Sequence, residues 1–268
     1  MNACLINGQM INSLAITDRA IHYGDGLFET IALKHGVMPF WSDHYQRLIL
    51  ACERLKFPIP NEALLLQEID TVKHNQDKAI IKIILTRGQG ERGYRIPKEQ
   101  HIKRIVQAYA FPDYPKHYYE QGVQVIFCKT PVSENKTLAG IKHLNRLDNV
   151  LASSEWTDPN IAEGLMCNAK DDIIQGTKSN LFYAQGGELF TPDLSHCGIL
   201  GIMRAQILTW AELHDIRVNI IPIAREKLLQ ADEVFLCNSI FGIWPVTNIE
   251  GRLLKVGHYT QKLIQYFG

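Results

Sequence analysis

Short apolar runs rich in β-branched residues alternate along the chain with stretches in which apolar residues recur every three or four positions. The first pattern is typical of strands and the second of amphipathic helices. The first pattern predicts strands at 27–34, 37–41, 79–86, 104–109, 123–129, 164–168, 181–185, 188–191, 218–223 and 233–237. The second predicts helices at 42–55, 61–74, 142–156 and 201–213. Because strands and helices mix throughout, the chain is expected to be an α/β or α+β protein.

One proline-containing segment divides this pattern into two halves. Phe111-Pro-Asp-Tyr-Pro-Lys116 has two prolines and no periodicity, which is typical of a connection between domains. The 268 residues are enough for two modest domains. We therefore expect an N-terminal α/β subdomain at 1–112, a linker at 113–120, and a C-terminal α/β subdomain at 121–268 that carries Lys142.

Composition excludes several classes of partner. The formal net charge is zero, so no electrostatic argument favours nucleic acid or a membrane surface. The apolar runs are too short to cross a bilayer, and the first residues lack the basic start and apolar run of a signal peptide, so a cytoplasmic protein is expected. The six cysteines are scattered without the close Cys/His spacing of a zinc site, which indicates reduced thiols and no metal.

A glycine-rich loop follows the strand expected at 79–86. Gly88–Gly93 satisfies G-x-G-x-x-G, but a dinucleotide site needs a helix to begin inside that motif, and Pro97 disfavours one. What remains is a loop presenting Arg87 and Arg92, whose guanidinium groups can bind a carboxylate bidentately. An exposed loop arginine is more often simply solvated, and the residues alone leave both readings open.

Lys142 is the residue with the most distinctive candidate chemistry. It lies between Ile141 and Leu144 at the start of an expected helix, where desolvation or nearby positive charge would lower its pKa. A neutral lysine amine can form a Schiff base. Most lysines, however, extend along the surface into solvent, and the residues alone favour that alternative.

Two further features are suited to phosphate. The helix expected at 201–213 follows Gly201, and the backbone N–H groups of Ile202 and Met203 at its start can bind an anion. Arg47 lies three residues after His44 and therefore on the same helix face, where it reaches a phosphate or belongs to an ordinary polar surface.

Taken together, the motifs resemble fold-type IV pyridoxal-phosphate enzymes, the group that holds D-amino-acid aminotransferases, branched-chain aminotransferases and aminodeoxychorismate lyases. Tyr23-Gly-Asp-Gly-Leu-Phe-Glu29 is similar to the N-terminal signature of this family, and His44-x-x-Arg47-Leu48 to its phosphate-gripping helix. Gly176–Phe182 and Gly201–Arg204 resemble the segments beside the cofactor ring and phosphate. The resemblance runs nearly end to end and implies the two-subdomain fold of D-amino-acid aminotransferase.

The resemblance also implies the site residues. Pyridoxal 5'-phosphate would be the cofactor, bound to Lys142 as a Schiff base. The implied cofactor contacts are Arg47, Lys142, Gln175, Thr177, Asn180, Ile202, Met203, Asn238 and Ser239. The implied substrate contacts are Phe28, Arg92, Tyr94 and His143, with Arg146 as a further candidate nearby. The family further implies a small-molecule substrate and a homodimer in which the loop of Arg92 reaches a neighbouring subunit.

Three stretches resemble the lyase branch in particular. They are Ala139–Leu147 around the lysine, Arg87–Tyr94 in the substrate loop, and Ala231–Ser239 near the C-terminus. They imply a folate-biosynthesis lyase that converts 4-amino-4-deoxychorismate to 4-aminobenzoate and pyruvate. A D-amino-acid or branched-chain aminotransferase is the alternative.

Gln175 departs from the family pattern. The family has a glutamate five residues before the asparagine that is Asn180 here, placed against the ring nitrogen of the cofactor. A carboxylate keeps that nitrogen protonated, whereas a neutral amide cannot supply the ion pair. Losing one such electrostatic partner costs about 3–4 kcal/mol. The expectation is that Gln175 narrows the enzyme toward elimination, and a cofactor-binding protein with weak catalysis is a further alternative.

Overall fold

The computed structural model describes residues 4–267 and divides into two compact units. The first unit is Met1–Pro112 together with Ile141–Asn145, and the second is Asp113–Gly140 together with Arg146–Gly268. The chain thus leaves the second unit for five residues, which include Lys142, and then returns to it. Within the described residues, no helix is long and apolar enough to cross a membrane.

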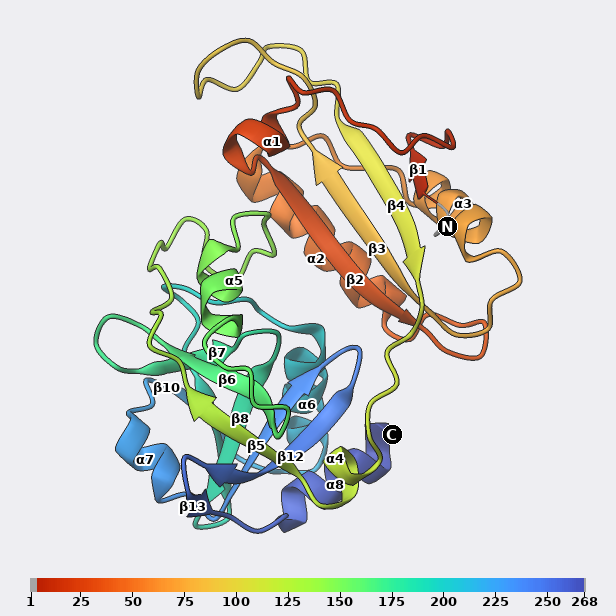
Figure 1. Cartoon of the computed structure of the whole chain (residues 1–268). Helices are drawn as coiled ribbons and strands as arrows, with labels where there is room; N and C mark the ends of the chain where they lie inside the picture. The colour runs from red at the N-terminus through yellow and green to blue at the C-terminus, as the bar shows by residue number, and fades with distance from the viewer. Residues whose placement is uncertain (1–3, 268) are drawn as a thin grey trace. The chain divides into compact units, whose positions relative to one another are not determined.

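The first unit is a four-stranded antiparallel sheet with helices on one face (Figure 1). The strand order is β1-β4-β3-β2. The strands are β1 (Cys4–Ile6), β2 (Gly26–Leu33), β3 (Ala79–Thr86) and β4 (Lys103–Tyr109). The helices are α1 (Arg19–Tyr23), α2 (Trp41–Leu55) and α3 (Glu62–Lys73).

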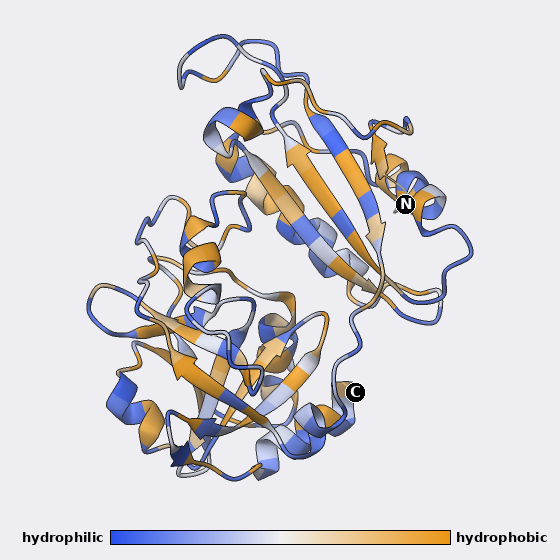
Figure 2. Cartoon of the chain, in the orientation of Figure 1, coloured by the Kyte–Doolittle hydropathy of each residue, from blue (hydrophilic) through white to orange (hydrophobic). Residues whose placement is uncertain are grey.

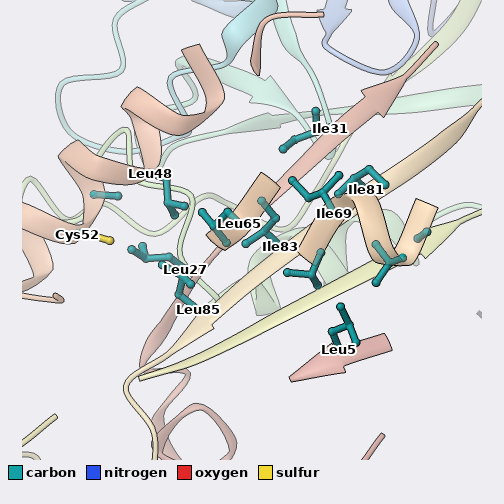
Figure 3. Packing of buried hydrophobic residues seen from close by; sticks show 14 of the residues in the cluster. Leu5, Leu27, Ile31, Leu48, Cys52, Leu65, Ile69, Ile81, Ile83 and Leu85 are labelled. Atoms are coloured by element: carbon teal, nitrogen blue, oxygen red, sulfur yellow. The ribbon is translucent and has the colours of Figure 1, made fainter. Parts of the chain in front are cut away.

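The core of this unit follows from the alternation of residues along β3. Ile81, Ile83 and Leu85 point to one face, as every second residue of a strand does, and all three are buried. They pack against Leu48 of α2 and Leu65 of α3 (Figure 3). Figure 2 shows hydrophobic colour along most of β2 and β3 and mixed colour along α2, which has one face in this core and another outside it.

The start of α2 corrects one sequence expectation. The expected strand at 37–41 is absent from the described structure, where Lys34 and Val37 form a single bridge. Phe40 adopts a left-handed conformation (φ 62°) and directly precedes the helix, which begins at Trp41. The chain has too few residues after the turn to extend a hairpin before the helix starts. The helices expected at 42–55 and 61–74 are confirmed to within a residue.

The second unit contains a nine-stranded mixed sheet (Figure 1). Its order is β10-β9-β8-β11-β12-β5-β6-β7, with β13 beside β12. The sheet curls, because β7 at one end also contacts β8 and β9. The strands are β5 (Val123–Phe127), β6 (Ile161–Cys167), β7 (Ile173–Gly176), β8 (Asn180–Gln185), β9 (Glu188–Pro192), β10 (Val218–Ile221), β11 (Glu233–Asn238), β12 (Gly242–Ile249) and β13 (Arg252–Leu253). The helices are α4 (His117–Glu120), α5 (Leu147–Ser153), α6 (Ile202–Leu213), α7 (Arg225–Leu229) and α8 (His258–Phe267).

The chain divides differently from the sequence expectation in two places. The expected linker at 113–120 contains α4, and Tyr114, Tyr118 and Tyr119 pack against the core of the second unit. Lys142 was expected in the C-terminal subdomain, but Ile141–Asn145 groups with the first unit. The physical reason is burial and pairing: Ile141 is part of the first core, and the residues after it bond to β2.

Candidate cofactor and substrate site

Lys142 is held in an extended segment beside β2 and does not lie on a helix. Phe28 donates its backbone N–H to the carbonyl of Lys142 (3.0 Å), and Leu144 donates to the carbonyl of Gly26 (3.0 Å). The expected helix at 142–156 is therefore wrong in its first part, and α5 begins at Leu147. This pairing uses the carbonyl of Lys142 and the N–H of Leu144. It places the lysine beside β2, the edge strand of the sheet.

Gly26 makes this approach of the two segments possible. A Cβ atom there would lie 2.5 Å from the carbonyl oxygen of Leu85 and 2.6 Å from a methyl carbon of Leu144. Only a residue without a side chain fits between β3 and the lysine segment at this point of β2. The glycine of the Tyr23–Glu29 motif thus has a packing role next to the lysine segment.

The amine of Lys142 lies over an aromatic ring. Its Nζ is 4.1 Å from the centroid of Phe28, whose ring also has Nζ of Lys82 at 5.7 Å. A ring face attracts a cation at such distances. The structure thus brings two expected site residues, Phe28 and Lys142, into contact. His143, a third, is buried and forms a bridge with Leu27 of β2.

Arg47 forms a buried ion pair with Glu29. Arg47 donates from Nε to Oε1 of Glu29 (2.8 Å) and from a terminal nitrogen to Oε2 (2.5 Å), and Nδ1 of His44 lies 2.7 Å from Oε2. Burial alone would raise the pKa of the Glu29 carboxyl, but the charge of Arg47 and the hydrogen bonds from His44 and Arg47 lower it to about 2. The carboxylate fixes the orientation of Arg47, whose role toward phosphate stays a prediction.

The entry to α6 is held by hydrogen bonds on several sides. Asn180 donates its side-chain amide to the carbonyl of Ile199 (3.0 Å), Gly140 donates to the carbonyl of Gly198 (2.9 Å), and Leu200 donates to the carbonyl of Gly140 (3.2 Å). Gly201 precedes the helix without a side-chain cap, and a Cβ there would collide with Oδ1 of Asn180. Asn180, expected to touch the cofactor, is engaged in positioning this turn.

The helix that follows offers an anion site. The first amides of a helix have no partner within the helix, and no side chain caps those of α6. Ile202 and Met203, the expected phosphate contacts, begin this helix and are buried. An anion placed there receives backbone donors without the need for a basic side chain.

Gln175 is nearly inaccessible to solvent, with 3% of its surface exposed. Its Oε1 accepts the backbone N–H of Ile199 (3.0 Å). The residue therefore touches the same turn that leads to α6. Position 175 is where the resembled family pattern has a glutamate, and contact of Gln175 with a cofactor stays a prediction.

Glu163 of β6 is a buried acid that is not among the expected site residues. Its Oε1 accepts from the N–H of Gly164 and from both the N–H and hydroxyl of Thr177, at 2.5–3.1 Å. Its Oε2 accepts from the N–H of Lys178 and the hydroxyl of Ser179, at 3.0–3.3 Å. The hydroxyl of Thr177, an expected cofactor contact, is thus used to bind Glu163.

Asn238 organises the turn at the end of β11. Its Oδ1 accepts from the N–H groups of Ile240 and Phe241, and its Nδ2 donates to the carbonyl of Lys178 (3.0 Å). These bonds connect the turn that contains Ser239 with the segment held by Glu163. Contact of Asn238 and Ser239 with a cofactor stays a prediction.

The two arginines of the glycine loop differ in burial. Arg87 is 3% exposed and donates to Asp25, to Gln100 and to the carbonyls of Leu55 and Lys56. The expectation that the loop presents Arg87 to a ligand is wrong, because these bonds occupy it in the interior.

Arg92 and Tyr94, by contrast, lie on the exposed part of this loop. Tyr94 is 85% exposed. Arg19 of α1 binds the loop by donating to the carbonyls of Gly93 (3.0 Å) and Tyr94 (3.2 Å). The backbone of the loop is anchored while the two expected substrate residues remain accessible.

Each of the two units has a feature that suits one part of pyridoxal phosphate. An uncapped helix start follows a glycine that leaves no room for a side chain, which matches the geometry of a phosphate site. A lysine on a strand edge, beside a ring, supplies the amine for the aldehyde. No group of His, Cys, Asp and Glu that could hold a metal occurs among residues 4–267.

The family model for amino-transferase class IV matches residues 26–249, which is most of the chain. The chain belongs to amino-transferase class IV. This family depends on pyridoxal phosphate, and the mixed α/β architecture described above is that of its fold-type IV members. The expected fold class and cofactor are thereby confirmed.

Similar proteins of this class include lyases and aminotransferases. The chain is 32% identical to the aminodeoxychorismate lyase of Vibrio harveyi over 96% of its own length and 95% of that protein. It is 41% identical to 4-amino-4-deoxychorismate lyase from Pseudomonas aeruginosa, with a TM-score of 0.94 over 98% of this chain and 97% of that one. It is 26% identical to the branched-chain aminotransferase of Escherichia coli, with a TM-score of 0.89 over 99% and 93% of the two chains.

Two buried acidic residues of this structure are recognisable from their place in the sequence. Glu29 and Glu163 are charged residues inside apolar strand patterns, Leu-Phe-Glu-Thr-Ile and Ile-Ala-Glu-Gly-Leu. A buried charge requires a partner, so each glutamate predicts a nearby donor. The pattern does not say which donors these are, since most of them belong to other segments of the chain.

Proposed function

We propose that this chain is a lyase that converts 4-amino-4-deoxychorismate to 4-aminobenzoate and pyruvate. The observation that carries the proposal is the full-length likeness to two proteins with that name, at 32% and 41% identity. The positions of Lys142 and of the α6 entry are consistent with it. The substrate is a small molecule, which agrees with the names of the relatives.

The proposed roles in cofactor binding follow the family motifs. Lys142 would hold the cofactor through its aldehyde and is the covalent anchor in this proposal. Arg47, oriented by Glu29, and the amides of Ile202 and Met203 bind the phosphate. Bound pyridoxal phosphate would withdraw electron density from the substrate carbon that carries the amine. Thr177, Asn180, Asn238 and Ser239 support this site by fixing the turns around it.

The proposed chemistry has Lys142 as its base. With the substrate amine held by the cofactor, Lys142 would accept the proton from the substrate carbon that bears this amine. The C–O bond to the enolpyruvyl group then breaks, its electron pair leaves on oxygen, and protonation gives pyruvate. The ring that remains is aromatic. Arg92 binds a substrate carboxylate with help from Tyr94, while Phe28 and His143 contact the substrate.

The test uses purified protein loaded with cofactor and supplied with enzymatically generated 4-amino-4-deoxychorismate. We expect equal amounts of 4-aminobenzoate and pyruvate from the wild type and from Lys227→Ala, an exposed control on α7, and neither product from Lys142→Ala. Borohydride reduction should fix the cofactor on the peptide with Lys142. Labelling of another lysine would refute the assignment.

An aminotransferase is the second candidate, favoured by the likeness to the branched-chain enzyme of Escherichia coli. It predicts reversible conversion of the cofactor between its aldehyde and amine forms with amino acids and keto acids, and no 4-aminobenzoate. A cofactor-binding protein with weak catalysis predicts neither reaction. We further propose a homodimer, for which light scattering of the purified protein is the direct test. A cytoplasmic location stays a prediction of the sequence.

A further inference from the structure

The orientation of the Gln175 amide is determined by its partner. The backbone N–H of Ile199 is a donor, so the atom of Gln175 that faces it at 3.0 Å must be the oxygen. The other terminal atom is then Nε2, which carries two N–H donors and has no acceptor capacity. Exchanging the two atoms would set donor against donor inside a residue that is 3% exposed.

The turn that carries Ile199 cannot easily move to change this. Ile199 also receives a bond on its carbonyl from Asn180, and its neighbours Gly198 and Leu200 are both bonded to Gly140. A Cβ atom on Gly198 would lie 3.3 Å from Oε1 of Gln175, so this glycine packs close to the oxygen. The amide is therefore fixed with its oxygen toward the turn.

The nearby acid Glu163 does not take over the role of the missing carboxylate. Both of its oxygens are occupied by five donors from Gly164 and the 177–179 segment. This carboxylate serves the turn between β7 and β8. If an oxygen of Glu163 turned away to act at the cofactor ring, the buried donors that now bind it would lose their partner, which costs free energy.

We propose that Gln175 donates a hydrogen bond from Nε2 to the ring nitrogen of the cofactor, which keeps that nitrogen unprotonated and limits the enzyme to elimination. The inference rests on the proposed function and on the resemblance to fold-type IV enzymes, which implies that position 175 faces the ring nitrogen. A nitrogen that accepts a hydrogen bond uses the lone pair that protonation would need. The ring then stabilises a carbanion less strongly, which slows transamination. Elimination is less affected because formation of an aromatic product drives it.

The first test is the ring-nitrogen signal of holoenzyme loaded with cofactor that is 15N-labelled at this position. A neutral pyridine nitrogen and a pyridinium nitrogen have well-separated chemical shifts. We expect the neutral signal in the wild type and in the exposed control Gln230→Glu, and the protonated signal in Gln175→Glu. Glutamate is nearly the same shape, and its second oxygen still accepts from Ile199. A protonated nitrogen in the wild type overturns the proposal, whatever the variant shows.

The second test is transamination of D-alanine with 2-oxoglutarate. We expect Gln175→Glu to be about a hundred- to a thousand-fold faster than the wild type, and Gln230→Glu to match the wild type. Equal rates in wild type and Gln175→Glu overturn the proposed restriction to elimination. The two levels of inference remain separable. A protein that makes 4-aminobenzoate with a protonated ring nitrogen retains the lyase function and loses this inference, whereas one that makes none loses the proposed function.

Discussion

Replacing Glu29 by glutamine tests the buried ion pair that orients Arg47. The pKa of Glu29 falls from 4.5 to about 2 in the folded chain. One pKa unit corresponds to about 1.4 kcal/mol, so the ionised carboxylate stabilises the fold by about 3 kcal/mol at neutral pH. Removing one partner of a buried pair costs a similar amount, about 3–5 kcal/mol, because the other charge stays buried. We therefore expect Glu29→Gln to lower the free energy of unfolding by about 3 kcal/mol at pH 7.

The pH dependence gives this prediction its sign. A carboxyl with a depressed pKa in the folded state stabilises the protein fully above its unfolded pKa of 4.5, and the contribution disappears as the pH falls toward about 2. The stability difference between wild type and Glu29→Gln should thus be nearly constant above pH 5. It should shrink to about half near pH 3.

The assay is urea unfolding followed by hydrogen exchange of peptides from α2 and β2, which reports the first unit separately from the second. Asp70→Asn is the control, because Asp70 pairs with Lys73 at the surface with a side chain 73% exposed. An exposed pair contributes about 0–1 kcal/mol. A loss below about 1 kcal/mol for Glu29→Gln, or a loss that is the same at pH 7 and pH 3, would refute the reasoning.

Three further substitutions separate positioning from binding. Gly201→Ala introduces a Cβ that collides with Oδ1 of Asn180. We therefore expect about ten- to a hundred-fold weaker binding of pyridoxal phosphate in a fluorescence titration. Unchanged affinity would contradict the role of this turn. Arg87→Lys removes several buried hydrogen bonds and should cost about 3 kcal/mol of stability in urea unfolding with the KM for substrate unchanged. Arg92→Ala should do the reverse, raising KM by about ten- to a hundred-fold with stability unchanged; a normal KM would exclude Arg92 as the carboxylate ligand.

Local sequence patterns were sufficient for most of the individual elements. Ala79–Thr86 is a strand with the bounds expected, and β8 and β9 lie within a residue of the strands expected at 181–185 and 188–191. Such elements are recognisable because period, turn residues and apolar content all agree within a few positions. The motifs also identified the family, since order and wording of several short segments are a stronger signal than any one of them.

Patterns failed where a long-range partner decides the backbone. The residues around Lys142 have helical spacing, yet they form an extended segment because β2, more than a hundred residues earlier, offers backbone partners. The strand β12 was not among the expected strands, and it contains Pro245, a residue that is unusual inside a sheet. It pairs with β5, β11 and β13, and no local signal in the sequence specifies its pairing with β5 and β11.

The sequence by itself determined which residues are available for chemistry: Lys142, the glycine before α6, and an amide in place of an acid at position 175. Only the tertiary structure decided which side chains are buried and in which direction their polar groups point. It placed Arg87 in the interior and left Arg92 outside, although both belong to one glycine loop. It also set the direction of the Gln175 amide through the N–H of Ile199, which is 24 residues away. The physical reason is that a side chain has its donors and acceptors from its own chemistry, but their direction comes from partners that only folding brings near.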